Sequence, residues 1–135
     1  MAIETERLIL REIDPERDFE PWARAMADEN TVRYLGVKPM TRAEAWRSMA
    51  LVIGHWSIRG FGFFSLEHRE TGAWIGRVGP WFPQGWPAPE VGWTIAPEFV
   101  AVDDVRGMIQ LMHAAVTNES PADPHAALRE RLEKG

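Results

Sequence analysis

The chain has 135 residues, of which 45% are hydrophobic and 26% are charged, and its formal net charge is −5. This composition is typical of a soluble globular protein, so we expect residues 1–135 to form a single domain. The negative charge, without any lysine- and arginine-rich block, argues against binding to nucleic acid or to a membrane surface. There is no cysteine, which excludes disulfides and thiolate metal sites and is consistent with a cytoplasmic protein.

The first third of the sequence predicts a strand followed by a helix. Residues 7–13, RLILREI, are rich in leucine and isoleucine and predict the strand. Asp14 followed by Pro15 is typical of a helix start, because aspartate caps free N–H groups and proline suits the first helical position. The spacing of large apolar residues predicts the buried face of this helix, which would carry Phe19, Trp22 and Met26.

A second helix is predicted from a capping box. Thr41 and Glu44 have the spacing at which each side chain bonds the backbone of the other, and Gly60 is typical of a helix end. A 3/4 spacing again predicts the buried face, here consisting of Trp46, Met49, Ile53 and Trp56.

The middle of the chain predicts strands. Residues 61–68 and 73–82 read as a β-hairpin with a turn between them, and residues 83–89 read as a proline-rich loop. Residues 90–95, EVGWTI, alternate in character and predict a third strand in this region. One side of that strand would carry Val91, Trp93 and Ile95.

The composition changes at Phe99, because no aromatic residue follows it. The remaining sequence predicts one or two helices, the first with an apolar stripe at 3/4 spacing and the second starting at Asp123 and Pro124. The predicted order β-α-α-β-β-β-α-α indicates an α+β domain with a mostly antiparallel sheet. The stripe of the first of these helices consists of Val102, Val105, Ile109, Met112 and Val116.

Three segments carry a family resemblance: ETERLILREI at 4–13, RGFGFFSLEHRETGAWIGRVG at 59–79 and PEVGWTIAPEF at 89–99. In this order they resemble the GNAT N-acetyltransferases, in particular the RimJ/RimL-like branch, which acetylates protein N-termini and related amines. The resemblance covers about residues 4–99. It implies a three-layer α/β fold of GNAT type and transfer of an acetyl group from acetyl-CoA to an amine, either a protein N-terminus or a small-molecule amine.

The sequence departs from this family after Phe99. The family has a glycine-rich turn there, followed by a helix whose first N–H groups hold the acetyl-CoA pyrophosphate. This chain instead reads VAVDDVRG over 100–107, without a glycine pair and with Asp103 and Asp104 where phosphates would bind. Because a hydrogen bond to a charged group contributes about 1.5–3 kcal/mol, we expect binding of acetyl-CoA to be impaired. We therefore expect an incomplete sheet over 4–99 and an atypical helical tail over 100–135.

The resemblance implies roles for three groups of residues. Glu90 would be the general base for the attacking amine; the alternative is a solvated glutamate at a strand end. The strand residues Val91, Gly92, Trp93, Thr94 and Ile95 would contact the cofactor; the alternative is a plain sheet strand. The loop residues Trp81, Phe82 and Trp86 would form a wall for the acceptor substrate; the alternative is a hydrophobic lid folded onto the sheet.

A second function class stays open beside the enzyme. The chain could be a truncated, non-catalytic module derived from a GNAT domain, forming a homodimer through its sheet edge or its C-terminal helix. A shifted reading frame or a recombination would explain why the glycine turn and the aromatic residues are lost together. The four histidines lack the spacing of metal ligands, so no metal is expected.

Overall fold

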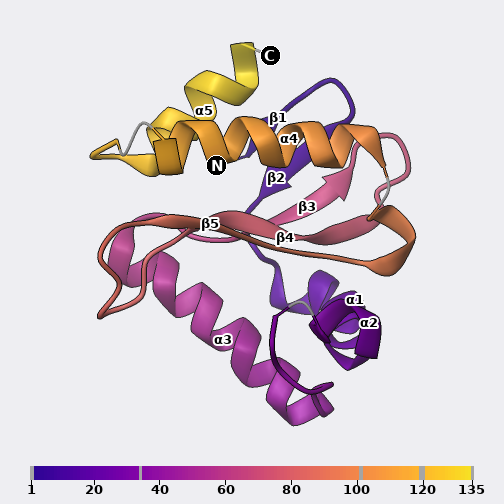
Figure 1. The fold of residues 1–135 in the computed structure, drawn as a ribbon. Helices are drawn as coiled ribbons and strands as arrows, with labels where there is room; N and C mark the ends of the chain where they lie inside the picture. Colours follow the sequence, from indigo (N-terminus) through magenta and orange to yellow (C-terminus); the bar gives the residue numbers. More distant parts are fainter. Residues whose placement is uncertain (1, 34, 101, 119–120, 135) are drawn as a thin grey trace.

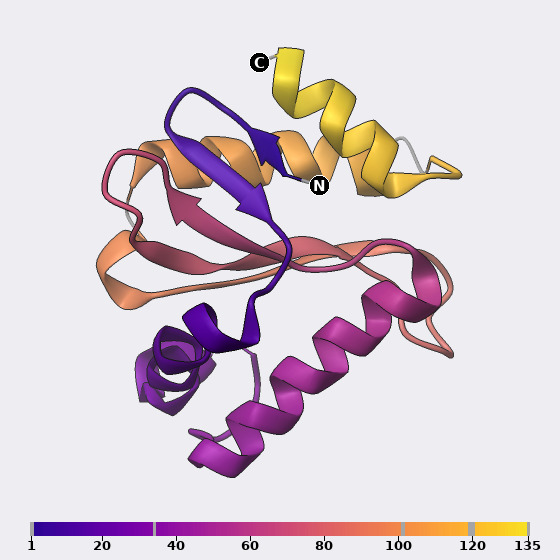
Figure 2. The ribbon, with the colours of Figure 1, turned by 180° about the vertical axis from the view of Figure 1, so that it is seen from behind.

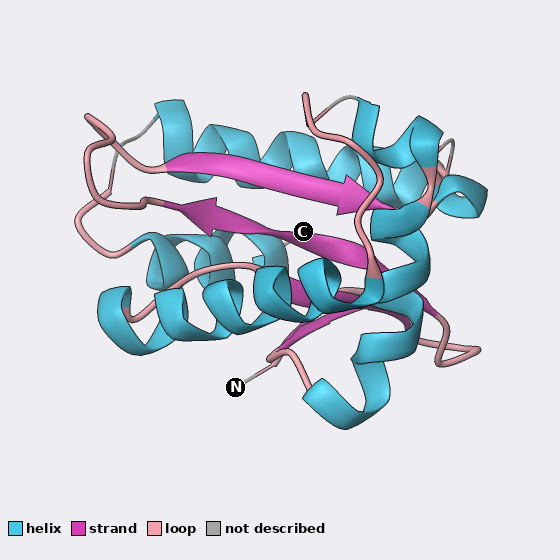
Figure 3. Cartoon of the chain, turned by 90° about the horizontal axis from the view of Figure 1, so that it is seen from below, coloured by secondary structure: helices cyan, strands magenta, loops and turns pink. Residues whose placement is uncertain are grey.

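The computed structural model describes residues 2–33, 35–100, 102–118 and 121–134. Five antiparallel strands form one sheet in the order β1-β2-β3-β4-β5, with α4 and α5 above it and α1, α2 and α3 below it (Figure 1). Figure 3 shows from below how the strands run side by side. The strands are β1 (Ile3–Glu4), β2 (Leu8–Arg11), β3 (Phe64–His68), β4 (Trp74–Trp81) and β5 (Glu90–Ile95). The helices are α1 (Pro15–Ala27), α2 (Glu29–Arg33), α3 (Arg42–Arg59), the short 3-10 helix η1 (Pro97–Phe99), α4 (Asp103–His113), the π-helical turn η2 (Ala114–Asn118) and α5 (Pro124–Lys134).

This order confirms the predicted α+β class and the antiparallel sheet, and it adds two short elements. The strand β1 has two residues and the helix α2 has five, so neither is long enough to show a periodic pattern. A local signal for α2 does exist, because Asp28 accepts a hydrogen bond of 2.8 Å from the backbone N–H of Thr31. Asp28 therefore acts at the start of α2 as Asp14 does at the start of α1.

The predicted helix ends are confirmed by their hydrogen bonds. Asp14 Oδ1 accepts from the N–H groups of Glu16 and Arg17, at 3.0 and 3.3 Å. Thr41 and Glu44 form both bonds of the capping box, and α3 ends at Gly60, whose φ of 79° is left-handed. These signals are local, so they act independently of the tertiary fold.

The predicted buried face of α3 is partly wrong. Trp46 is 61% exposed and Ile53 is 37% exposed, whereas Met49 is buried as expected. The reason is that both sides of α3 are apolar, and α1 packs against the side with the smaller residues. That side is fixed by a hydrogen bond of 2.9 Å from Trp22 Nε1 to Ser48 Oγ. The residues of α3 that are buried are Ala45, Met49, Val52 and His55.

The sheet separates two hydrophobic clusters. The upper cluster joins the strands to α4, η2 and α5, and α5 lies beside β1 (Figure 2). The stripe predicted after Phe99 is confirmed there, since Val105, Met112 and Val116 are at most 1% exposed. The lower cluster joins α1 and α3 to Phe63. Its fully buried members include Trp22 and Met26 of α1.

Candidate functional site

A pocket of about 360 Å³ lies at the outer edge of β5, between α2 on one side of the sheet and α4 on the other. A volume of this size is within the range of small-molecule sites, which are mostly apolar with a few polar groups. The pocket is lined by Asn30, Thr31, Arg33, Leu35, Trp93, Thr94, Ile95, Pro97, Val100, Val105, Arg106 and Ile109.

The edge of β5 carries unpaired backbone groups at every second residue. The N–H of Ala96 donates to the carbonyl of Ile75 in β4 at 2.8 Å, and the antiparallel register continues from that pair. Thr94, Gly92 and Glu90 therefore turn their backbone groups toward β4. The remaining residues turn their N–H and C=O groups outward, and the described part of the chain has no strand beyond β5. These outward groups belong to Val91, Trp93 and Ile95.

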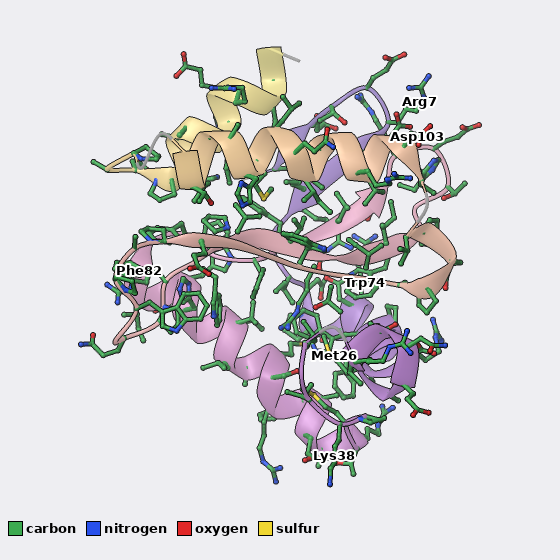
Figure 4. The ribbon with its side chains drawn as sticks, in the orientation of Figure 1. Arg7, Met26, Lys38, Trp74, Phe82 and Asp103 are labelled. Atoms are coloured by element: carbon green, nitrogen blue, oxygen red, sulfur yellow. The ribbon has the colours of Figure 1, made fainter. Side chains whose placement is uncertain are left out.

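The start of α4 differs from what its two aspartates suggest. Neither Asp103 nor Asp104 lines the pocket, whereas Arg106 does. Asp104 forms an ion pair of 3.4 Å with Arg7, which lies beside the first turn of α4 (Figure 4). The side chain of Asp103 is 98% exposed. The N-cap residue of α4 is Val102, whose side chain forms no hydrogen bond with the first N–H groups of the helix. Neither carboxylate lines the pocket, but that of Asp103 lies 4.0 Å from a terminal nitrogen of Arg106, which does line it.

The structure brings together three of the five expected cofactor residues. Trp93, Thr94 and Ile95 line the pocket. Val91 is buried in the upper cluster, and Gly92 packs against the ring of Phe63, where an added Cβ would lie 2.6 Å from a ring carbon. Val91 can therefore offer only its backbone at the edge, and the backbone groups of Gly92 face β4.

Trp93 is more exposed than its neighbours on the same side of β5. It is 45% exposed, although Val91 and Ile95 on the same side of the strand are buried. Its side chain stands at the outer edge of the sheet, where no further described strand covers it. The three residues share one side of the strand, as predicted.

Glu90 lies at the opposite end of β5 from η1 and does not line the pocket. It is exposed and is paired in register with Trp81 of β4. Three residues along a strand span about 10 Å, so Glu90 is about that far from Trp93. The expected base and the pocket residues of β5 therefore lie at different points along the strand.

The loop aromatics serve the structure on the lower side of the sheet. Trp81 stacks between His55 and Phe63, with ring centroids 4.1 and 4.6 Å away. The guanidinium of Arg59 lies 4.3 Å from the ring centroid of Phe82 and its Nε donates to the Phe82 carbonyl at 2.7 Å. Phe82 lies at the end of the sheet opposite Asp103 (Figure 4).

Trp86 differs from the other two loop aromatics because it is 41% exposed. Trp81 and Phe82 are only half-buried but are held by their neighbours, as expected for a lid packed on the sheet. Trp86 is therefore the loop aromatic with most surface left for an acceptor.

Two histidines make the stability of the fold sensitive to acid. The Nδ1 of His55 lies 2.8 Å from the carbonyl of Phe61 and its Nε2 accepts from the N–H of Phe82 at 2.9 Å, which fixes the neutral ring. Burial lowers the pKa of His55, and burial also lowers that of His125, whose buried Nε2 has no hydrogen-bond partner among the described residues. The unfolded chain therefore binds protons at a pH where the folded chain does not, so lowering the pH below about 6.5 destabilises the fold.

We expect the free energy of unfolding to fall between pH 7 and pH 5.5, by at most about 1.4 kcal/mol per pH unit for each histidine. Urea unfolding at several pH values measures it. The exposed His113 provides the matched control, because its replacement by Gln should leave the slope unchanged. A stability that is constant over this pH range would contradict the assignment of neutral, hydrogen-bonded rings.

Sequence reasoning missed one wall of the pocket and both of its arginines, Arg33 and Arg106. Asn30, Thr31 and Arg33 come from α2, which was not predicted at all. Arg106 lies in the segment that replaces the glycine-rich turn of the family, and the sequence predicted no role for it. A helix starting at Asp103 predicts that Arg106 lies one turn after the start, but it does not predict the direction in which the side chain points.

Comparison with known proteins decides the family. Residues 7–126 match the family model described as the acetyltransferase (GNAT) domain. The chain belongs to the GNAT acetyltransferase family. The match extends past Phe99 through α4, so the expected end of the resemblance at residue 99 is too early.

Solved GNAT structures share this fold. An acetyltransferase from Agrobacterium tumefaciens str. C58 aligns with 98% of this chain and 82% of its own at a TM-score of 0.69 and 21% identity. A GNAT-family acetyltransferase from Bordetella pertussis aligns with 98% of this chain and 87% of its own at 0.68 and 23% identity. RimL, a ribosomal L7/L12 α-N-protein acetyltransferase in complex with coenzyme A, aligns with 97% and 82% at 0.60 and 14% identity. No curated protein matches the chain significantly.

Two further observations concern the described residues of this GNAT domain. They include no group of three or more histidine, aspartate or glutamate side chains that could hold a metal ion. No helix formed by them combines the length and the apolar character needed to cross a membrane.

Proposed function

We propose that this GNAT domain transfers an acetyl group from acetyl-CoA to an amine, and that it belongs to the RimJ/RimL-like branch, whose acceptors are protein N-termini and related amines. The observation that carries the proposal is the outer edge of β5, where unpaired backbone groups border an apolar pocket with Arg106 at its rim. Family membership supports the reaction class. The three segments over 4–99 support the branch.

The residues present fit the cofactor along β5. The outward N–H and C=O groups of Val91, Trp93 and Ile95 suit the amide groups of an extended pantetheine arm, as an added strand would. Thr94 and Ile95 supply the pocket wall, and Gly92 lets the strand lie close to Phe63. When bound, acetyl-CoA supplies an acetyl group activated as a thioester.

The start of α4 is expected to bind the pyrophosphate of acetyl-CoA more weakly than a glycine-rich turn does. The uncapped start of α4 offers N–H groups, and Arg106 adds one positive charge beside them. Against this, Asp103 lies in the same helical turn and places a negative charge near any bound phosphate. We therefore propose an impaired affinity rather than a lost site.

Glu90 is the proposed general base. It is exposed at the first residue of β5, where a carboxylate can accept the proton that the acceptor amine loses, directly or through water. Trp86, together with Trp81 and Phe82, borders the same end of the sheet and is the proposed acceptor wall.

Calorimetric titration with acetyl-CoA tests the site, and we expect measurable binding in wild type. Replacing Arg106 by Ala should weaken it about 10-fold, because one charged contact is lost, and Asp103→Asn should strengthen it. The exposed Arg47 of α3 provides the control, since Arg47→Ala removes the same charge far from the pocket. Glu90→Gln should leave binding intact and lower turnover about 10²-fold or more. No heat signal at millimolar acetyl-CoA would count against the enzyme.

One observation favours the second candidate, a non-catalytic module. The outward edge of β5 can pair with a strand of another chain as readily as with a cofactor, and the neighbouring Trp93 and Val100 are 45% and 56% exposed. A homodimer through this edge, or through the C-terminal helix, would then cover that surface. In that case acetyl-CoA fails to bind, and analytical ultracentrifugation shows a dimer that Trp93→Glu disrupts.

A further inference from the structure

A row of polar side chains crosses the lower face of the sheet. Arg11 of β2 pairs in register with Ser65 of β3, Ser65 with Arg77 of β4, and Arg77 with Thr94 of β5. Such a row under a sheet is unusual, because this face otherwise packs on the apolar residues of α1 and α3. Its last member, Thr94, also lines the pocket at the outer edge of β5.

The inner half of this row is electrically satisfied. Asp18 of α1 is 1% exposed and accepts two hydrogen bonds from Arg11, at 2.8 and 2.9 Å. It accepts a third from Ser65 Oγ at 2.7 Å. Arg11 also donates to Glu67 at 3.0 Å, so its charge is balanced by two carboxylates.

The outer half contains a guanidinium without a carboxylate. Arg77 forms no ion pair with any described residue, and its single hydrogen bond there runs from Nε to Thr94 Oγ1 at 3.1 Å. Its terminal nitrogens form no hydrogen bond with a described residue, and the side chain as a whole is partly exposed. Burial lowers the pKa of Arg77 to about 10, so the group stays positively charged at neutral pH.

Two aromatic rings hold this guanidinium in place. Its central carbon lies 5.1 Å from the ring centroid of Trp22 and 4.7 Å from that of Phe63. Trp22 is fully buried and Phe63 stacks on Trp81, so the platform is rigid. The fork of terminal N–H groups is thus oriented before any ligand arrives, which reduces the entropy lost on binding.

We propose that Arg77 and Thr94 bind an oxyanion carried by the acceptor amine, a carboxylate or a phosphate, and so determine which amines are acetylated. The planar fork of Arg77 matches two oxygens of either group. The Thr94 hydroxyl accepts from Nε and keeps its own proton to donate. Arg77 itself is not among the residues that line the pocket, so an anion would reach it beside Thr94, which does line it. This inference rests on the proposed function, since it names the class of acceptor amine.

Binding of the anion is tested first, without cofactor or amine. Propionate and inorganic phosphate are titrated while the Arg77 Nε–H resonance is followed by NMR, with propionamide as the neutral control. We expect a saturable shift with at least one anion and none with propionamide. The anion that gives the shift distinguishes a carboxylate from a phosphate. The absence of a shift with both anions at millimolar concentration overturns the inference.

Acceptor preference is tested next, with β-alanine, phosphoethanolamine and the neutral β-alaninamide. In Arg77→Met, kcat/KM for the preferred anionic amine should fall about 10–100-fold, because charged hydrogen bonds are lost, while that for β-alaninamide changes little. Arg77→Lys keeps the charge but not the planar fork, so its kcat/KM for the anionic amine should lie between those of wild type and Arg77→Met. This second variant keeps the test valid if Arg77→Met fails to fold. Arg47→Met is the control for a distant arginine.

The two proposals fail separately. If anions bind at Arg77 but no amine is acetylated, the proposed enzyme activity is wrong and the oxyanion site is retained. If wild type acetylates amines, but Arg77→Met and Arg77→Lys lower kcat/KM equally for all three amines or for none of them, the oxyanion site is wrong and the proposed enzyme activity is retained.

Discussion

Replacing Asp18 by Ala is expected to lower the free energy of unfolding by about 3–5 kcal/mol, because it breaks a buried ion pair from one side. The side chain of Arg11 is only 15% exposed and would lose both bonds to this carboxylate. Ser65 Oγ and the backbone N–H of Asp14, which donates to Asp18 at 2.8 Å, would also lose their acceptor. Urea unfolding at neutral pH measures the loss.

The matched control for Asp18 is Glu20, an acid on the same helix. Glu20 pairs with Arg42, but both side chains are at least 60% exposed, so Glu20→Ala should cost far less than Asp18→Ala. Equal losses in the two variants would show that the Asp18 network contributes no more than a surface pair.

The same network gives Asp18 a characteristic pH dependence. Burial opposes ionisation of its carboxylate, but the hydrogen bonds from Arg11, Ser65 and Asp14 outweigh it and lower the pKa below the usual 3.8. A lowered pKa means that the stabilisation is present above about pH 4 and is lost as the pH falls further. This lies below the range in which His55 and His125 act, so acid unfolding should show both contributions in sequence.

The sequence predicted those features that depend on neighbours along the chain. The starts of α1 and α3 follow from Asp14 and Thr41, and the end of α3 follows from Gly60, because capping acts within one helical turn. The β4 and β5 segments were predicted for the same reason, from alternation bounded by proline and glycine.

The polar row and the pocket were not predicted, because both depend on register. Ser65 and Asp18 are 47 positions apart, and they meet only when β2 pairs with β3 while α1 packs beneath them. Arg77 reads in the sequence as an ordinary hairpin residue. Only the pairing of β4 with β5 places it next to Thr94 and the pocket.

A related limit applies to α3. Its apolar residues occur on two sides, so spacing alone allowed the choice of Trp46 and Ile53 for the core. The core instead accepted His55, whose two ring nitrogens are both satisfied by backbone groups of Phe61 and Phe82. A polar residue was buried there because loop partners, distant from any helical pattern, were available to it.

Gly79→Ala is the second change expected to have a large effect, with a loss of about 3 kcal/mol or more in the free energy of unfolding. A Cβ added to Gly79 would overlap the backbone carbonyl of Gly62 and lie 2.8 Å from the Cα of Phe63. Gly76→Ala should act similarly, because its Cβ would overlap the Thr94 carbonyl and lie 2.9 Å from the Cα of Ile95. Backbone atoms of paired strands cannot move aside without breaking the sheet.

Two other glycines provide comparison variants for which smaller or opposite effects are expected. The Cβ of Gly92→Ala would meet only side-chain atoms, those of the Phe63 ring, and no backbone atoms, so the loss should be smaller. The Cβ of Gly107→Ala meets nothing within 4 Å, and in the middle of α4 it should stabilise the fold by about 0.5–1 kcal/mol. Urea unfolding of the four variants should therefore rank Gly79 and Gly76 as most destabilised and Gly107 as stabilised. If Gly79→Ala were tolerated as well as Gly107→Ala, then β4 would not pack against β3 and β5 as closely as this structure requires. The rigid platform beneath Arg77 would then lack its support.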